Sequence, residues 1–328
     1  MEKQLLCRVG NIFAQFQCKM GQCRQACCQG WPVSIDRDKY FQLLGVECDP
    51  ALRRRLDTAM PLADYPTPQR YAQLSHRYDG DCALRDPDGR CGLQVQLGEE
   101  ILPDVCRLYP RSIRRDALGA ECVLANSCEA VCELFWDRAE PLRWQEEPVA
   151  LQAGADSPVG TRDGEGRLAQ DRAVALLQDR RYSIAQRLLA LCPPELSAAP
   201  AQPGQWPELI DDLCRRTDAV PELCRALPCA QPDPARELFL EHLLVNHAWF
   251  TQFPTEPGQS YAAQYRALCL TWALAKGILS AAGTREQITD RISRLFRFIQ
   301  HTHFTSLAEA LTLKYRVHPR QLVDGTLT

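Results

Sequence analysis

Four cysteines occur within eleven residues in the stretch Cys18-Lys19-Met20-Gly21-Gln22-Cys23-Arg24-Gln25-Ala26-Cys27-Cys28-Gln29-Gly30-Trp31. The thiolate form of cysteine binds metals and attacks electrophiles, and thiols crowded this closely pack poorly as a hydrophobic core. The two glycines suit a loop that wraps around an ion, because glycine adopts backbone conformations closed to other residues. The stretch therefore predicts a metal or redox centre held by an irregular loop.

The other cysteines of the first 132 residues follow at long, uneven intervals. After Cys7 they are Cys48, Cys82, Cys91, Cys106, Cys122, Cys128 and Cys132. Turn-forming residues at 78–81 and 86–89 place Cys82 and Cys91 at the two ends of a tight loop. Ligation by cysteine alone favours zinc or an iron–sulfur cluster, yet the chain has neither paired zinc knuckles nor the ferredoxin run. The ligands must converge through the fold, and the spacing leaves both metals open.

Composition places the chain among globular proteins with room for two domains. Its 328 residues are 45% hydrophobic and 24% charged, and the net charge of −3 argues against broad affinity for nucleic acid or membranes. The N-terminus has no signal-peptide pattern, and the most apolar stretch, residues 268–282, is too short to cross a bilayer. We therefore expect a cytoplasmic protein. In that compartment thiols are kept reduced, and since seventeen cysteines are an odd number, they cannot all be paired in disulfides.

The chain divides into three parts by composition. Residues 1–136 are rich in cysteine, glycine and aspartate, and short helices are expected at 36–44 and 49–59 with Asp36 and Asp49 as N-caps. Residues 137–166 are rich in proline and glycine, which indicates a linker. Residues 167–328 show apolar positions at helical spacing. The helices expected there are 167–177, 183–191, 206–216, 237–250, 260–282 and 284–301, the last opened by a capping box of Thr284 and Gln287.

These parts predict a mainly α fold. It consists of a Cys-rich N-terminal domain of irregular chain and short helices around a metal cluster, followed by a C-terminal helical bundle. A Rossmann sheet is not expected, because no run of parallel-strand segments exists and the one glycine-rich candidate, 160–166, follows no strand. Five later cysteines sit singly on helices or near proline and are expected to be buried apolar residues. They are Cys192, Cys214, Cys224, Cys229 and Cys269.

The order of residues around the cysteines resembles the N-terminal region of the FliB-type flagellin lysine-N-methylases. The resemblance covers about residues 12–135. It rests on the motifs Phe16-Gln17-Cys18-x4-Cys23-x3-Cys27-Cys28-Gln29-Gly30-Trp31-Pro32, Asp81-Cys82, Gly89-Arg90-Cys91, Leu102-x3-Cys106, Tyr109-Pro110-Arg111 and Ser127-Cys128-Glu129. A broader family of cysteine-cluster proteins that chelate zinc or iron shares only the core cysteine pattern. Ala83 stands where the family often has proline, which is a minor loop change that keeps Cys82 as a ligand.

The resemblance implies an enzyme that methylates the ε-amine of lysine on flagellin, its protein partner. It also implies S-adenosylmethionine as methyl donor and an iron–sulfur cluster, which we expect to be of the 4Fe-4S type, with zinc as the alternative. The family-type cysteines, taken as metal ligands, are Cys18, Cys23, Cys27, Cys28, Cys82, Cys91, Cys106 and Cys128. Of these, Cys18, Cys28 and Cys128 rank behind the other five. Cys7, Cys48, Cys122 and Cys132 are extra in this chain and are not expected to bind metal.

Candidates for the chemistry lie close to Cys106 in the sequence. Tyr109 or Asp104 is a candidate acceptor for the proton of the substrate lysine, and Arg111 is a candidate partner for the carboxylate of the methyl donor. A radical mechanism stays open, although the usual Cys-x3-Cys-x2-Cys motif is broken at Gly30. The alternative hypothesis is a structural zinc- or iron-binding interaction module without catalysis.

Overall fold

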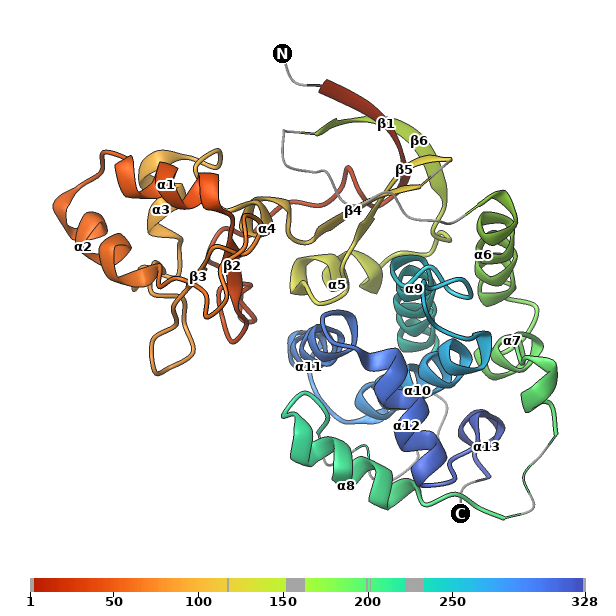
Figure 1. Ribbon diagram of the computed structural model, residues 1–328. Helices are drawn as coiled ribbons and strands as arrows, with labels where there is room; N and C mark the ends of the chain where they lie inside the picture. Colours follow the sequence, from red (N-terminus) through yellow and green to blue (C-terminus); the bar gives the residue numbers. More distant parts are fainter. Residues whose placement is uncertain are drawn as a thin grey trace. The chain divides into compact units, whose positions relative to one another are not determined.

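The computed structural model describes residues 3–116, 118–151, 163–198, 200, 202–221, 224 and 233–326 (Figure 1). The chain forms two compact units. Residues 17–109 form one, the cysteine unit, and the described segments before 17 and after 109 form the other, the helical unit. The partition differs from the expected boundary at 136, because residues 110–136 pair and pack within the helical unit. The expected linker 137–166 contains the strand β6 (Trp144–Leu151), and residues 152–162 lie outside the described part of the chain.

A four-stranded mixed sheet belongs to the helical unit. Its strands are β1 (Lys3–Gly10), β4 (Arg111–Asp116), β5 (Gly119–Leu124) and β6, in the order β4-β5-β1-β6. β1 runs parallel to β5, with Cys7 opposite Ala120, and antiparallel to β6, with Cys7 opposite Glu147. The predicted mainly α character holds, but the sheet corrects the prediction of an N-terminal region made of short helices and irregular chain. Only the β1–β5 pair of this sheet is parallel, so it is not a doubly wound Rossmann sheet.

A row of opposite charges across the sheet explains why the sequence pattern does not predict its strands. Arg114 lies opposite Glu121, and Glu121 lies opposite Arg8 on the next strand. Glu121 is 1% exposed, and the Nη2 atom of Arg167, from α6 (Gly164–Leu177), lies 3.5 Å from its Oε1 atom. Opposite charges on neighbouring strands stabilise a sheet. They also remove the alternation of apolar and polar residues by which a half-buried strand is detected in sequence.

Helices build the rest of the helical unit around one large apolar core. Besides α6 they are α5 (Glu129–Trp136), α7 (Ile184–Ala190), α8 (Trp206–Arg216), α9 (Pro234–Phe250), α10 (Tyr261–Ser280), α11 (Arg285–Gln300), α12 (Phe304–Lys314) and α13 (Pro319–Asp324), with a 3-10 turn at Pro194–Leu196. The six helices predicted after residue 166 are confirmed to within a few residues, whereas α12 and α13 were not predicted. The capping box is confirmed too, since Thr284 Oγ1 accepts from the Gln287 N–H at 3.3 Å.

α9 and α10 form the centre of this core. They contact each other, α9 also contacts α5 and α6, and α10 also contacts α11, α12 and α13 (Figure 1). α10 contains most of the apolar stretch noted above, and nearly all of its side chains are buried. Across the described residues, no helix has the length and apolar character that crossing a membrane requires.

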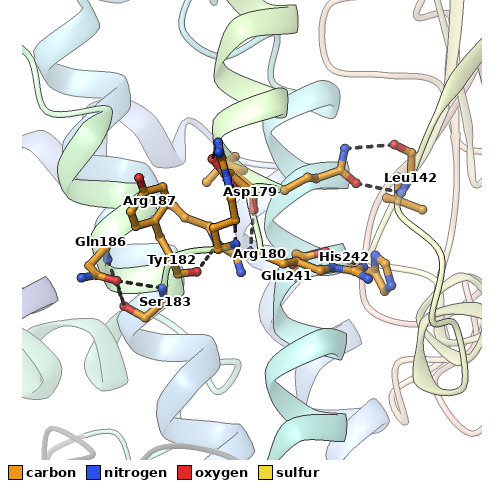
Figure 2. Close-up of polar contacts among 12 residues, drawn as sticks. Leu142, Asp179, Arg180, Tyr182, Ser183, Gln186, Arg187, Glu241 and His242 are labelled. Atoms are coloured by element: carbon orange, nitrogen blue, oxygen red, sulfur yellow. Dashed lines mark hydrogen bonds and ion pairs between the residues drawn. The ribbon is translucent and has the colours of Figure 1, made fainter.

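An ion triad with two buried members, Glu241 and Arg187, ties the corner between α6 and α7 to α9 (Figure 2). Glu241 of α9 is 3% exposed. Its carboxylate lies 2.8 Å from Nη2 of Arg180 and 2.6 Å from Nη1 of Arg187. Arg187 also donates to the carbonyl oxygens of Leu177 and Tyr182, which close the corner. Since Glu241 and Arg187 are both buried, the cost of burying either charge is offset only while the other remains.

Burial sets His247 of α9 apart from an ordinary histidine. The side chain is 4% exposed, it contacts the ring of Phe296, and desolvation lowers its pKa to about 4. In an unfolded chain a histidine titrates near pH 6.5, so below that pH the unfolded chain binds a proton that the folded chain does not. We therefore expect the free energy of unfolding to fall by about 3 kcal/mol between pH 7 and pH 4 from this residue alone. Urea titrations followed by circular dichroism measure this loss.

The matched variants for this prediction are His247→Leu and His303→Gln, since His303 is an exposed histidine of the same unit. His247→Leu should flatten the dependence of stability on pH, whatever its effect at pH 7. His303→Gln should leave the dependence unchanged. Equal pH slopes for His247→Leu and the wild type would show that His247 does not carry the effect.

The cysteine unit has a small core of its own. Its elements are β2 (Val33–Ile35), α1 (Arg37–Gly45), α2 (Pro50–Ala59), β3 (Ala72–Leu74), α3 (Gly92–Leu97) and α4 (Asp104–Leu108), and β2 pairs with β3. Both predicted N-caps are confirmed: Asp36 accepts from the Lys39 N–H at 2.9 Å, and Asp49 accepts from the Leu52 N–H at 2.9 Å. Several thiols join or pack against this core. They belong to Cys28, Cys48, Cys82, Cys91 and Cys106.

Candidate metal centre

The loop that carries Cys27 and Cys28 is held by two other segments. The two sulfur atoms lie 3.8 Å apart. The indole N–H of Trp31 donates to the Cys27 carbonyl oxygen, and the Trp31 ring stands edge-on to Tyr109 with centroids 5.2 Å apart. The backbone N–H of Cys82 donates to the Cys28 carbonyl oxygen at 2.8 Å. The loop is therefore joined both to the Cys82 segment and to the residue that follows α4.

Cys82 and Cys91 bracket the turn-rich loop that the sequence predicts. Arg85 and Cys91 form an isolated β-bridge, and the Gly89 N–H donates to the Asp86 carbonyl oxygen at 2.9 Å inside the turn. Gly89 has a φ of +88°, and a Cβ atom there would lie 2.6 Å from the carbonyl oxygen of Gly21. The backbone of the first cysteine loop at Gly21 thus packs directly against the backbone of the turn at Gly89. Gly21 serves this close approach, a role that the sequence did not reveal.

Burial and neighbouring thiols raise the pKa of four thiols in this unit. The hydrogen bond with Cys27 and then burial raise the pKa of Cys28 far above its usual range. Burial first, and then the neighbouring Cys28 and Cys91, raise the pKa of Cys82 to about 11. Burial is the largest cause for Cys91 and Cys106 as well, and other thiols of the group add to it. A bound metal cation reverses this balance, because it stabilises the thiolates.

The donor set of this unit fits a soft metal. Cys28, Cys82, Cys91 and Cys106 lie in or against one small core, and the sulfur atom of Cys27 lies 3.8 Å from that of Cys28. Within the described part of the chain, no group of three or more Cys, His, Asp or Glu side chains stands in a ready metal-holding arrangement. The chemistry of the set is nonetheless specific, since sulfur ligands select zinc or an iron–sulfur cluster over hard cations.

The other three family-type cysteines have different surroundings. Cys18 is exposed, and its sulfur accepts from the Met20 N–H at 3.4 Å. Cys23 is half-buried and follows the crossing at Gly21. Cys128 belongs to the helical unit, where it is the N-cap of α5. Five of the eight predicted ligands lie at the small core of the cysteine unit or beside a thiol that does.

The cysteines not expected to bind metal lie among apolar neighbours or against backbone. Cys7 and Cys122 are buried on β1 and β5, and burial raises the pKa of Cys122 to about 12. Cys132 donates to the Asn126 carbonyl oxygen at 3.0 Å. In the helical unit, Cys192, Cys214, Cys224 and Cys269 belong to or pack against the apolar core. Cys229 lies outside the described residues.

The candidates for proton transfer and donor binding fall in both units. Asp104 forms an ion pair with Arg107, with an Nη2–Oδ1 distance of 2.7 Å. Tyr109 contacts Trp31 through its ring. Arg111 begins β4 in the helical unit, where its guanidinium lies over the ring of Phe16, 5.0 Å from the centroid. Asp104 and Tyr109 thus share the unit of the grouped thiols.

Three residues that contact the cysteine segments were not among the predicted site residues. They are Trp31, Asp81 and Arg85. Asp81 immediately precedes Cys82, and Arg85 follows it by three residues. Their closeness to Cys82 was the one sequence signal for a role at this site, but an aspartate and an arginine in a turn-rich segment are more often solvated surface residues.

Comparison with known proteins gives two similar sequences. A protein named lysine-N-methylase from Salmonella choleraesuis is 23% identical over 145 residues, which are 44% of this chain and 36% of that protein. A protein of the same name from Salmonella typhimurium is 21% identical over 145 residues, with the same shares. The match thus spans about a third of the length of these relatives.

No model of a known protein family matches the chain. No solved structure matches it either. The sequence comparison agrees with the resemblance seen in the cysteine motifs, and it does so over a limited part of both chains. Over these 145 residues, the chain is similar to lysine-N-methylases.

Proposed function

We propose that this protein is a lysine N-methyltransferase that acts on flagellin. The methyl donor is S-adenosylmethionine, and an iron–sulfur cluster is bound by the cysteine unit. The observation that carries the proposal is the placement of four thiols at one small core, with Cys27 beside Cys28, in a chain similar to lysine-N-methylases. The two supports are independent, because one is the arrangement of side chains and the other is sequence identity.

The cysteine unit supplies the ligands in this proposal. Cys27, Cys28, Cys82, Cys91 and Cys106 would hold the cluster, and Cys18 and Cys23 of the same unit remain further candidates from the family pattern. When bound, the cluster would supply a metal site for the methyl donor. The high thiol pKa values mean that metal uptake releases protons, so uptake is favoured as the pH rises.

The transfer itself requires a neutral lysine amine in line with the methyl group. The lysine nitrogen forms a bond to the methyl carbon while the bond from that carbon to the sulfonium breaks, which yields methyllysine and S-adenosylhomocysteine. The proton of the amine passes to a base, for which Asp104 and Tyr109 are the proposed acceptors.

A second candidate is a structural zinc- or iron-binding interaction module without catalysis. It is favoured by the limited extent of the match, which spans about a third of the relatives' length. Under this alternative the cysteine unit resembles the methylases only because it folds around a similar metal site.

Label transfer separates the two candidates. Anaerobically purified, metal-loaded protein is incubated with flagellin and S-adenosylmethionine that carries an isotope-labelled methyl group, and mass spectrometry locates the label. We expect label on lysine Nζ atoms of flagellin and none on flagellin with acetylated lysines. Absence of label from every lysine, with metal present in the protein, would remove the methylase and leave the interaction module.

The choice of base has its own matched pair of variants. Removing a general base lowers the rate by about 100-fold or more. Tyr109→Phe or Asp104→Asn should show this loss in the initial rate of labelling. Tyr78→Phe is the control, because Tyr78 is fully exposed in the same unit. Rates within about twofold of wild type for both test variants would exclude these two residues as the base.

A further inference from the structure

Asp81 joins two of the segments that carry the grouped thiols. Its side chain is 16% exposed. Its Oδ1 atom accepts from Nε2 of Gln29 at 2.6 Å, and Gln29 immediately follows Cys28. The backbones of Gln29 and Asp81 also form an isolated β-bridge, and Asp81 itself immediately precedes Cys82. One carboxylate therefore holds the Cys28 segment beside the Cys82 segment.

Arg85 extends this link to a third segment. Its guanidinium is 12% exposed and donates from Nη1 to Oδ1 of Asp81 at 2.8 Å. Its Nε atom donates to the Gly89 carbonyl oxygen at 3.1 Å, at the crossing with the first cysteine loop. Arg85 is also the bridge partner of Cys91. The Asp81–Arg85 pair thus contacts the segments of Cys28, Cys82 and Cys91 at once.

The guanidinium of Arg85 is also fixed beside the segments that carry these thiols, through its bonds to Asp81 Oδ1 and to the Gly89 carbonyl oxygen. Several thiolates in one site repel each other, so a fixed positive charge beside them lowers the cost of assembling the site. A guanidinium that donates hydrogen bonds to both a carboxylate and a carbonyl oxygen has little freedom to move away.

We propose that Asp81 and Arg85 are positioning residues that preorganise Cys28, Cys82 and Cys91 for metal binding. They bind no metal themselves and take no part in methyl transfer. Residues that orient metal ligands without touching the metal typically account for about 10- to 100-fold in affinity. The inference rests on the proposed metal centre, but it does not depend on whether lysine is the substrate.

Cobalt(II) is the probe for this proposal, because thiolate ligation of cobalt gives strong absorption bands that report binding directly. The full chain is prepared metal-free and reduced under anaerobic conditions and is titrated with cobalt(II). We expect Asp81→Asn and Arg85→Gln to weaken cobalt binding by about 10- to 100-fold. Arg85→Lys keeps the positive charge but loses the planar set of guanidinium donors, so its cobalt affinity should lie between those of Arg85→Gln and the wild type.

The matched control is Asp88→Asn. Asp88 pairs with Arg90 in the same loop, but both side chains are about half exposed. This variant should bind cobalt like the wild type. Gln29→Leu removes only the link between Asp81 and the Cys28 segment, and it serves if Asp81→Asn or Arg85→Gln fails to fold by circular dichroism. It should also weaken binding.

Folded Asp81→Asn, Arg85→Gln or Gln29→Leu protein with wild-type cobalt affinity would overturn the proposal. A wild-type chain that gives no thiolate–cobalt bands would overturn it as well. If the variants bind cobalt more weakly than the wild type but the wild type does not methylate flagellin, the result would count against the proposed function alone. The two outcomes are therefore distinguishable.

Discussion

Replacing Cys106 by serine is expected to reduce the metal content of the anaerobically purified protein to below about a tenth of the wild-type value. Ligand-orienting residues alone account for about 10- to 100-fold in affinity, and loss of a direct ligand should cost at least as much. Cys106 lies in α4, packs against the core of the cysteine unit and shares its surroundings with Cys28, Cys82 and Cys91. Serine nearly preserves the shape of the side chain but replaces a soft ligand by a hard one.

Cys48→Ser is the matched control for this result. Cys48 packs against the same core, yet it is outside the family pattern and outside the group of thiols that affect one another. Iron, zinc and sulfide are measured in both variants and in the wild type, and circular dichroism confirms that each is folded. Equal metal content in Cys106→Ser and Cys48→Ser would show that Cys106 is no ligand. Iron with sulfide would support the cluster, and zinc alone would support the structural module.

Replacing Glu241 by glutamine is expected to lower the free energy of unfolding by about 3–5 kcal/mol. The carboxylate is buried between Arg180 and Arg187, so its neutralisation leaves two guanidinium groups without their shared counter-charge (Figure 2). Arg187 is 6% exposed and cannot reach water without opening the corner between α6 and α7. Urea unfolding followed by circular dichroism at neutral pH measures the change.

The control for this variant is Glu208→Gln in α8. Glu208 is exposed, and substitutions of exposed side chains usually change stability by about 0.5 kcal/mol or less. A loss in Glu241→Gln no larger than that of the control would mean that the triad is not a net source of stability. Arg187→Met tests the same triad from the other side, and it should also destabilise the fold, because Glu241 then keeps only Arg180.

Local signals in the sequence predicted much of the helical structure. Asp36, Asp49 and Thr284 were predicted as caps, and each accepts the expected backbone hydrogen bond. These contacts span two or three residues, so the residues that decide them are visible together in the sequence. The sheet was not predicted. β1 pairs with strands more than a hundred residues away, and its partners follow no apolar alternation.

The candidate site shows the same division. Cysteine type and order were enough to predict a soft-metal centre in the first part of the chain, because thiols at such density have few other uses. The ranking within the set stays a prediction, in which Cys28 stands behind Cys23; in the structure Cys28 is the thiol that raises the pKa of Cys82, Cys91 and Cys106. Ligand choice depends on which segments meet, and spacing alone does not reveal that.

By itself, the sequence determined most of the longer helices and three of their caps, the turns around Cys82 and Cys91, and the likeness to lysine-N-methylases. All of these depend on residue type and on neighbours close in the chain. The tertiary structure alone decided that residues 3–10, 111–116, 119–124 and 144–151 form a sheet with charged pairs, and that Asp81 and Arg85 connect three cysteine segments. These contacts join residues distant in sequence, and they form only when burial of the two cores brings their segments together.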